Sequence, residues 1–260
     1  MAISLSYVFF FLLVPFSSAS TACDGCLHQS TAAHSSNASA LQYGSCGYGS
    51  LAMELNSGQL AAAAPSLYKN GAGCGACFQV RCRNEKLCSK EGARVMVTGL
   101  GNTNTSDFML NSRAFAAMAT AGMSRDILQH GKIDIQYKRV PCEYKNRNLA
   151  IRVEESSQKP YYLAIQVLYQ GGQTEVVAME VAQVGSLSWR FMTRSSGAVW
   201  STGRVPEGPM QFRFVVTAGF DGKWVWVKRP LPADWVAGGI YDSGVQITDV
   251  ARESCSDCDG

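Results

Sequence analysis

The 260-residue sequence lacks the features of several large classes of protein. Its 23 Lys and Arg residues against 20 Asp and Glu residues give a formal charge of +3 with the signs interspersed, which is too weak to indicate nucleic-acid binding. It holds only 3 histidines, and no pair of them has metal-ligand spacing. Neither a serine elbow nor a phosphate-binding loop is present. We therefore expect no cofactor, no metal and no nucleic-acid partner.

Apolar runs long enough to cross a membrane are also missing, since residues 3–16 fall short of the about 20 residues that a bilayer requires. The small residues 18–20 follow this run, a pattern typical of a secretory signal peptide over residues 1–20. Sequons at Asn37 and Asn104 are consistent with glycosylation of a secreted chain. We expect a soluble, extracellular protein with no membrane partner.

Cysteine is absent between Cys142 and Cys255, whereas eight of the ten cysteines lie at or before Cys142. A cross-linked half and a cysteine-free half indicate two domains, which about 240 mature residues can form. We predict an irregular N-terminal arm, a first domain, a second domain and a cysteine-containing tail, over residues 21–39, 40–144, 145–249 and 250–260.

Four of the cysteines lie between Cys74 and Cys88, around an alternating stretch that predicts a half-buried strand. Cys77 and Cys82 point to opposite faces of this strand, and the polar loop before Cys88 is short enough for a local disulfide. Zinc is the alternative, because Cys74-x-x-Cys77 has the spacing of a ligand pair. An even number of cysteines in a secreted chain favours disulfides.

The remaining cysteines lie at the two ends of the mature chain. Cys23 and Cys26 are near its start, and Cys255 and Cys258 are near its end. The two pairs could tie the termini together, or each pair could close locally.

Alternation of apolar and polar residues predicts a mainly β chain. In the first domain, residues 94–98 and 133–137 are typical of strands, and Asn111 or Ser112 is expected to cap a helix that ends at Gly122. In the second domain, strands at short spacing with glycine-containing turns indicate a β-sandwich of about 100 residues. Its strands are predicted over residues 149–153, 161–169, 176–181, 210–217 and 224–228.

The same alternation assigns side chains to faces. Trp224 and Trp226 share one strand face, as a core pair or as an exposed stripe, and both alternatives stay open. Trp189 and Trp235 are predicted to be core or packing residues. In the strand at 161–169, the positions predicted to point outward are Tyr162, Ala164 and Gln166.

Four motifs, YGSCGYG, CGACFQVRC, DIQYKRVPC and YLA, begin at Tyr43, Cys74, Asp134 and Tyr162. In order and spacing the chain resembles the plant expansin superfamily, most closely its expansin-like A branch, over residues 40–248. This resemblance implies a double-psi β-barrel similar to endoglucanases, followed by an immunoglobulin-like β-sandwich that binds cellulose. It also implies three disulfides, Cys46 with Cys74, Cys77 with Cys142, and Cys82 with Cys88.

Hydrolysis by an inverting glycosidase needs two carboxyl groups about 6.5–9.5 Å apart. The resemblance places Met109 where typical expansins have the aspartate that corresponds to the catalytic acid of the endoglucanases. The loop that carries another aspartate in related expansins is missing, because Tyr43 is followed almost directly by Cys46. Asp107 could replace the acid from a displaced position, or it could cap the following helix or turn. We predict that the protein is not a hydrolytic enzyme.

A polysaccharide-binding surface needs exposed aromatic rings that contact the apolar faces of sugars. Tyr162 and Trp200 match two aromatic positions of the family, whereas Ser196 stands where the family often has tryptophan. Tyr43 matches a groove tyrosine, with a place in the barrel core as the alternative.

These observations predict a secreted, monomeric protein of the plant cell wall that binds cellulose or hemicellulose, with loosening of wall polymers as a further expectation. One alternative is a weak glycoside-cleaving or transglycosylating enzyme that uses Asp107. Another is a wall-resident protein-binding module. His28, His34 and His130 are predicted to be solvated polar residues without a catalytic role.

Overall fold

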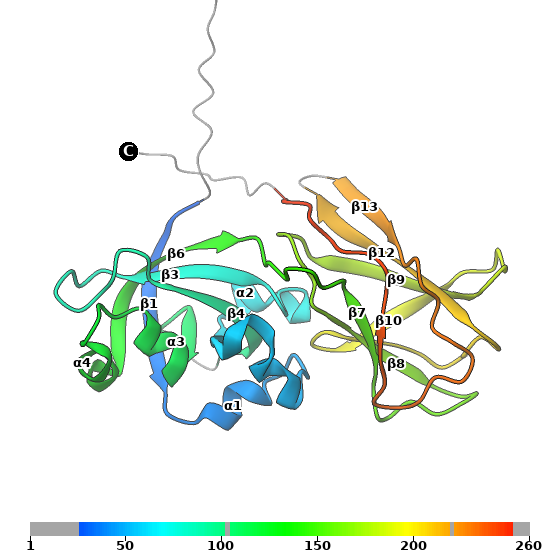
Figure 1. Ribbon diagram of the computed structural model, residues 1–260, viewed down its shortest axis with the longest axis horizontal. Coiled ribbons are helices and arrows are strands. Elements are labelled where there is room, and N and C mark those ends of the chain that lie inside the picture. The colour runs from blue at the N-terminus through cyan, green and yellow to red at the C-terminus, as the bar shows by residue number, and fades with distance from the viewer. Residues whose placement is uncertain (1–25, 102–104, 219–220, 252–260) are drawn as a thin grey trace, which may run out of the picture.

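The computed structural model describes residues 26–101, 105–218 and 221–251, which form two β-rich domains side by side (Figure 1). The predicted signal peptide, the sequon residue Asn104, and Cys23, Cys255 and Cys258 lie outside these ranges. No helix within the described ranges is long and apolar enough to cross a membrane.

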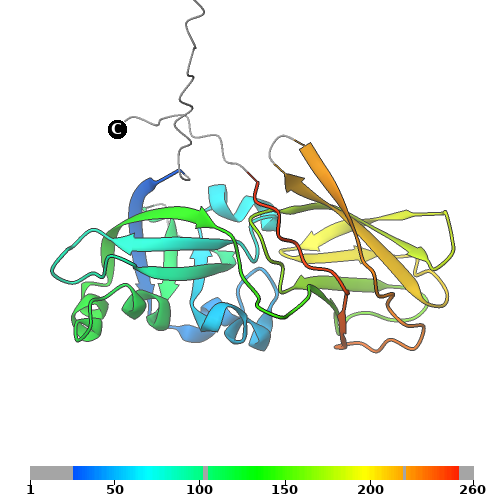
Figure 2. The ribbon, with the colours of Figure 1, turned by 45° about the horizontal axis from the view of Figure 1, so that its top comes forward.

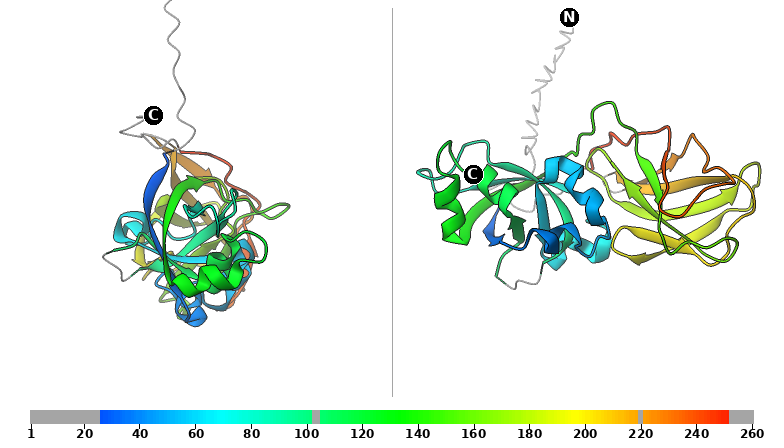
Figure 3. Two further views of the ribbon diagram at one scale, coloured as in Figure 1. Left: turned by 90° about the vertical axis from the view of Figure 1, so that its left-hand side faces the viewer. Right: turned by 60° about the horizontal axis from the view of Figure 1, so that its bottom comes forward.

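The first domain is a closed barrel, for which the described residues provide six strands in the order β1-β5-β2-β4-β3-β6. β1 pairs in parallel with β5, and β2 in parallel with β4, whereas the other neighbours are antiparallel. Figure 3 (left) views the barrel from the side away from the second domain. The strands are β1 (His28–Ser35), β2 (Leu60–Ala63), β3 (Cys77–Cys82), β4 (Ala93–Leu100), β5 (Phe108–Asn111) and β6 (Lys132–Val140).

Aromatic and small side chains share the barrel interior. The rings of Phe78, Phe108 and Tyr137 meet edge to face, with centroids 4.9 to 6.0 Å apart, an arrangement that favours aromatic pairs. Ala61 and Ala63 of β2 are fully buried beside them. The predicted mainly β barrel is therefore confirmed, with its core filled by side chains rather than open.

β1 overturns the prediction that residues 21–39 form an irregular arm, because residues 28–35 are a strand of the barrel. Ala32 is fully buried, and the backbone around it pairs with both β5 and β6. The Ser, Thr, Ala and His side chains of this segment give little apolar periodicity, so its partners on both sides determine the strand. His34 is not simply solvated either, since its Nε2 lies 2.9 Å from Ser112 Oγ.

Short helices connect the strands. Asn37, the first sequon residue, is exposed and caps α1 by accepting a hydrogen bond from the backbone N–H of Ala40 at 3.2 Å. The α-helices are α1 (Ala38–Gln42), α2 (Pro65–Tyr68), α3 (Ser112–Ala117) and α4 (Ser124–His130), and the 3-10 helices are η1 (Gly49–Met53), η2 (Leu55–Gly58) and η3 (Lys69–Gly71).

The predicted helix after residue 111 begins as expected and ends early. Asn111 caps α3, because its Oδ1 accepts a hydrogen bond from the Ala114 N–H at 3.0 Å. The backbone of residues 118–120 pairs with the loop around Cys88 instead of continuing the helix to Gly122. The sequence pattern does not predict α4, which follows.

Disulfides staple this domain. The described pairs are Cys46–Cys74, Cys77–Cys142 and Cys82–Cys88, which are the pairs that the resemblance implies. The zinc alternative at Cys74 and Cys77 is therefore wrong, because both sulfurs are already bonded. Cys26 is also disulfide-bonded, and the other terminal cysteines lie outside the described residues.

The second domain is a sandwich of antiparallel strands in the order β13-β12-β9-β10-β11-β8-β7-β14. β10 joins its two layers, since residues 190–192 pair with β9 and residues 193–196 pair with β11 (Figure 2). The core between the layers holds Phe212, Phe214 and Trp235, all buried. The strands are β7 (Ala150–Val153), β8 (Leu163–Leu168), β9 (Val176–Gln183), β10 (Arg190–Ser196), β11 (Val199–Thr202), β12 (Met210–Ala218), β13 (Asp221–Trp226) and β14 (Ile240–Asp242).

The outward face of β8 is covered by the first domain at Gln166. Ala164 and Gln166, which alternation assigns to the outside, are both buried. Gln166 Nε2 donates a hydrogen bond to the Cys46 carbonyl oxygen of the barrel at 2.8 Å. The predicted alternation of side chains along β8 is therefore confirmed, but the predicted exposure of Ala164 and Gln166 is wrong. The sequence pattern of one domain contains no signal for the surface of the neighbouring domain.

Candidate functional site

The barrel face that the resemblance assigns to catalysis carries an apolar row. Met109 of β5 is in register with Ala62 of β2, and Ala62 is in register with Gly99 of β4. Phe108 and Leu110 are fully buried in the barrel, so Met109 between them points outward, where it is half-buried. None of these three residues has a side chain that can give or take a proton.

Asp107 lies just before β5, and a hydrogen bond occupies its carboxylate. The hydroxyl of the buried Tyr137 donates to Asp107 Oδ2 at 2.9 Å. Asp107 does not cap α3, because Asn111 does, so the helix-capping alternative is wrong. Asp107 therefore holds the hydroxyl group of the buried Tyr137. Within the described ranges, no cluster of three His, Cys, Asp or Glu side chains is arranged to hold a metal ion.

Tyr43 is 67% exposed and lies beside the end of β4, outside the barrel core. Gly44 holds it there, since a Cβ at Gly44 would lie 2.4 Å from the Thr98 carbonyl oxygen. The Leu100 N–H donates to Ser45 Oγ at 2.7 Å and fixes the other side of the segment. Tyr43 and the exposed Leu100 therefore stand near the apolar row.

Two consecutive tyrosines precede β8. Tyr161 is 69% exposed and Tyr162 is half-buried. A tight turn fixes both, because their N–H groups donate to the Gln158 carbonyl oxygen at 2.9 and 2.8 Å. Tyr162 is a predicted binding residue, whereas the more exposed Tyr161 is not among the predicted residues. The sequence does place Tyr161 next to Tyr162, and this adjacency could have indicated a pair. The alternation of β8 does not apply to Tyr161, because β8 begins only at Leu163.

Trp200 does not lie on the surface, and the prediction that it forms part of an exposed platform is wrong. Its side chain is 5% exposed and belongs to the sandwich core. The Arg194 guanidinium lies 4.3 Å from the ring centroid. The inward parity of Trp200 on β11, a strand flanked by β8 and β10, explains its burial.

Three tryptophans gather instead on the outer face of the other layer. Trp224 is 44% exposed and Trp226 is 50% exposed, so the open choice for this pair is decided as an exposed stripe. Trp189, predicted as a core or packing residue, is half-buried and packs on Trp226, which it meets edge to face with centroids 5.2 Å apart. Arg213 of β12 lies over all three rings.

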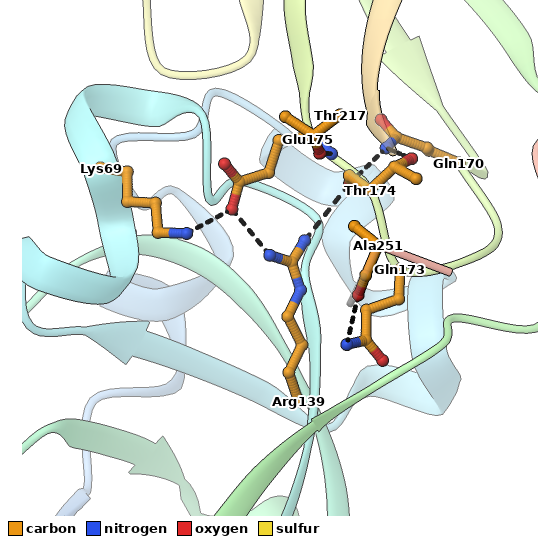
Figure 4. Close-up of polar contacts among 8 residues, drawn as sticks. All are labelled: Lys69, Arg139, Gln170, Gln173, Thr174, Glu175, Thr217 and Ala251. Atoms are coloured by element: carbon orange, nitrogen blue, oxygen red, sulfur yellow. Dashed lines mark hydrogen bonds and ion pairs between the residues drawn. The ribbon is translucent and has the colours of Figure 1, made fainter. Parts of the chain in front are cut away.

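An ion-pair cluster joins the two domains (Figure 4). Glu175 Oε1 accepts hydrogen bonds from Lys69 Nζ and from Arg139 NH1 of the barrel, each at 2.7 Å. Burial alone would raise the pKa of the Glu175 carboxyl, but the charges of Arg139 and Lys69 hold that pKa below its ordinary value. Arg139 NH2 also donates to the Thr174 carbonyl oxygen at 3.2 Å.

Backbone contacts between glycines bring the domains still closer. A Cβ at Gly71 would lie 2.3 Å from the Gly197 carbonyl oxygen, and one at Gly197 would lie 2.1 Å from the Ser45 carbonyl oxygen. Arg194 spans the same contact, donating to the carbonyl oxygens of Gly71 and Gly197 at 3.2 and 3.0 Å. The barrel and the sandwich are therefore joined in one fixed orientation.

Two family models match the chain. Residues 149–232 match the model described as Expansin C-terminal domain. Residues 60–137 match the double-psi β-barrel model DPBB_1, described as lytic transglycolase. Together they cover most of the sandwich and most of the barrel.

Full-length relatives are similar over nearly the whole chain. The Expansin-like A2 protein of Arabidopsis thaliana is 60% identical over 256 residues, which are 96% of this chain and 97% of the relative. Expansin-like A1 of the same plant is 58% identical over 96% of this chain and 97% of the relative. Expansin-like A3 of Oryza sativa subsp. japonica is 51% identical over 92% and 88%.

Solved structures share the two-domain arrangement. The apo expansin of Clavibacter michiganensis superposes with a TM-score of 0.65 at 23% identity, over 85% of this chain and 98% of that one. A point mutant of the same bacterial protein in complex with cellohexaose gives the same TM-score at 22% identity. At these identities the likeness concerns the fold.

Proposed function

The chain belongs to the expansin superfamily, in its expansin-like A branch, and from this premise we propose that it is a secreted plant cell-wall protein that binds cellulose or hemicellulose without cleaving it. The observation that carries the proposal is the exposed Tyr161 with its neighbour Tyr162, in the domain that matches the expansin C-terminal model. The bacterial expansin structure with bound cellohexaose supports the same class of ligand.

The tyrosine pair suits a glycan surface for physical reasons. A sugar ring has an apolar C–H face that gains by covering an aromatic ring, and its hydroxyl groups need polar partners at the rim. Tyrosine offers both a ring and a hydroxyl. Because the turn at Gln158 already orders the backbone of both tyrosines, binding does not have to pay for ordering that backbone.

Two observations on the barrel support binding without cleavage. The position of the family aspartate is Met109, in a row with Ala62 and Gly99 that offers no proton donor. Asp107, the nearest alternative along the chain, already accepts a hydrogen bond from Tyr137. The row itself therefore supplies neither a general acid nor a general base.

Sedimentation with insoluble cellulose tests the proposal. The variant Tyr161→Ala/Tyr162→Ala should bind about 10-fold more weakly than wild type, which is the loss of roughly 1.4 kcal/mol of aromatic contact. Leu187→Ala is the matched control, because Leu187 is 96% exposed and apolar but not aromatic. Equal retention of the tyrosine variant and wild type would remove the tyrosine pair from the binding surface.

The match to a model described as lytic transglycolase favours one other candidate, a weak glycoside-cleaving or transglycosylating enzyme that uses Asp107. Such an enzyme would shorten or exchange glucan chains, and Asp107→Asn would abolish this activity. A protein that binds no wall glycan and instead retains a wall protein would be the binding module of the third hypothesis. Wall loosening, the extension of the main proposal, is measured as extension of cell-wall strips under constant load.

A further inference from the structure

The tryptophan face consists of Trp189, Trp224 and Trp226 around Arg213, on the outer surface of the layer β13-β12-β9-β10. It lies apart from the tyrosine pair, because β12, β9, β10 and β11 separate β13 from β8 in the strand order. In Figure 1, β13 and β8 lie on opposite sides of the second domain. The role proposed for the tyrosines therefore leaves this face unused.

Arg213 is fixed at the centre of the face. Its Nε donates to Oε2 of Glu180, whose side chain is buried beneath it in the neighbouring strand. Its guanidinium carbon lies 4.3, 4.6 and 5.0 Å from the ring centroids of Trp189, Trp224 and Trp226. Among the described residues, its two terminal nitrogens make no protein hydrogen bond. Pre-positioned N–H donors therefore stand between exposed aromatic rings.

The charges of the face indicate a neutral ligand. In the register of the strands, the positions in line with Trp224 and Trp226 include Arg213 and Val215 of β12, and Glu180 and Ala178 of β9. Arg213 and Glu180 are the charged members of this set, and they neutralise each other. An anionic polymer would find no uncompensated cation there, whereas sugar hydroxyls can accept from the free N–H groups.

The ring geometry indicates a chain rather than a flat surface. Trp189 and Trp226 stand at 88° to each other, so one plane cannot lie against both. A crystalline polymer presents a plane, but a single chain can turn between rings of different orientation. Exposed aromatic rings of this number are a mark of a binding surface.

We propose that the tryptophan face is a second glycan-binding site, which takes single chains of neutral wall polysaccharide and leaves the flat cellulose surface to the tyrosine pair. The inference rests on the proposed function in one respect, that the protein is a glycan binder. It adds a division of ligands between two faces of one sandwich, with Arg213 donating hydrogen bonds to the hydroxyl groups of the bound chain.

The test compares two double variants of the full mature chain. Trp224→Ala/Trp226→Ala should lose at least 10-fold in affinity for soluble hydroxyethylcellulose and stay within 2-fold of wild type in sedimentation with microcrystalline cellulose, about 1.4 kcal/mol against less than 0.5 kcal/mol. Tyr161→Ala/Tyr162→Ala should show the reverse. Polygalacturonate, as an anionic probe, should bind at least 10-fold more weakly than hydroxyethylcellulose.

Three further measurements test the fold of the variants and the place of binding. Thermal unfolding of each variant, with Leu187→Ala as the control, shows whether the fold is kept. Arg213→Lys keeps the positive charge and loses the planar donors, so it should weaken hydroxyethylcellulose binding without abolishing it. In the tyrosine variant, which keeps the face intact, hydroxyethylcellulose should still change the tryptophan fluorescence.

Several results would overturn the inference. They are an unchanged hydroxyethylcellulose affinity in the folded tryptophan variant, equal binding of polygalacturonate, or no binding of hydroxyethylcellulose by wild type. If wild type still sediments with microcrystalline cellulose in that last case, the proposed function stands and the second site alone fails. Failure to bind either glucan would remove both.

Discussion

The barrel and the sandwich are stabilised in different ways and present different surfaces. The barrel contains the described disulfides and no tryptophan, and one of its faces carries the apolar row that includes Met109. The sandwich contains no cysteine and all five tryptophans, and it exposes aromatic side chains on two faces. The difference indicates a cross-linked barrel domain beside a sandwich domain that presents aromatic rings to solvent.

The contacts between the barrel and the sandwich join the two domains in spite of this difference. Ion pairs at Glu175 and close backbone contacts at Gly71 and Gly197 hold one orientation. Binding at the sandwich is therefore expected to place the barrel at a defined position on the polymer. Three perturbations test how far the domains differ and how firmly they are joined.

Removing the long-range disulfide Cys77–Cys142 should have the largest effect on the free energy of unfolding. Cys77→Ala/Cys142→Ala opens a loop with a sequence separation of 65 and should cost about 4 kcal/mol of unfolding free energy by the loop-entropy relation. Cys82→Ala/Cys88→Ala, with a separation of 6, is the matched control at about 2 kcal/mol. Urea unfolding followed by circular dichroism measures both.

Tryptophan fluorescence reports on the sandwich alone, because every tryptophan lies there. In the variant that lacks Cys77 and Cys142, the urea midpoint followed by tryptophan fluorescence should therefore shift less than the midpoint followed by circular dichroism. Equal costs for the two disulfide variants would contradict the loop-entropy explanation.

Gly197→Ala should break the junction. Its φ of 49° is a left-handed conformation that alanine adopts at a cost, and its Cβ would lie 2.1 Å from the Ser45 carbonyl oxygen. We expect a loss of about 3 kcal/mol and a larger radius of gyration in small-angle scattering as the domains separate. Gly203→Ala is the control, since no atom lies within 4 Å of its Cβ position. Identical behaviour of the two variants would show that the junction is looser than its contacts indicate.

Glu175→Gln should weaken the junction by about 2 kcal/mol, the value of a hydrogen bond to a charged partner. Because the folded pKa of Glu175 lies below its ordinary value, its contribution is complete above about pH 4.3 and is lost as the pH falls through the folded pKa. The difference in unfolding free energy between wild type and the variant should therefore be constant at neutral pH and shrink in acid. A difference that grows as the pH falls would reverse the sign of this linkage.

The strongly patterned parts of the fold were predictable from the sequence. Phe212 and Phe214 alternate with polar residues and occupy the sandwich core, and Asn111 caps its helix. β1 was not predictable, because its small polar residues carry no periodicity and the barrel neighbours supply its hydrogen bonds. Local pattern identifies a strand only where one of its faces is distinctly apolar.

The candidate site was less predictable than the fold. Alternation gives the parity of Trp200 and Gln166, but burial depends on which layer or domain covers each face. Arg213 carried no signal of its own, since its importance comes from three tryptophans that are distant in sequence or on another strand. The sequence shows where the aromatic residues lie along the chain, but only the packing of the layers shows which of them reach solvent.

The most direct test of the account measures binding and cleavage on one substrate at the same time. Wild type is incubated with phosphoric-acid-swollen cellulose, and the bound fraction and the released reducing ends are both determined. We expect the protein to be retained on the cellulose and the reducing ends to stay at the level of a protein-free control, with Asp107→Asn indistinguishable from wild type. Reducing ends that increase with protein concentration and disappear in Asp107→Asn would contradict it.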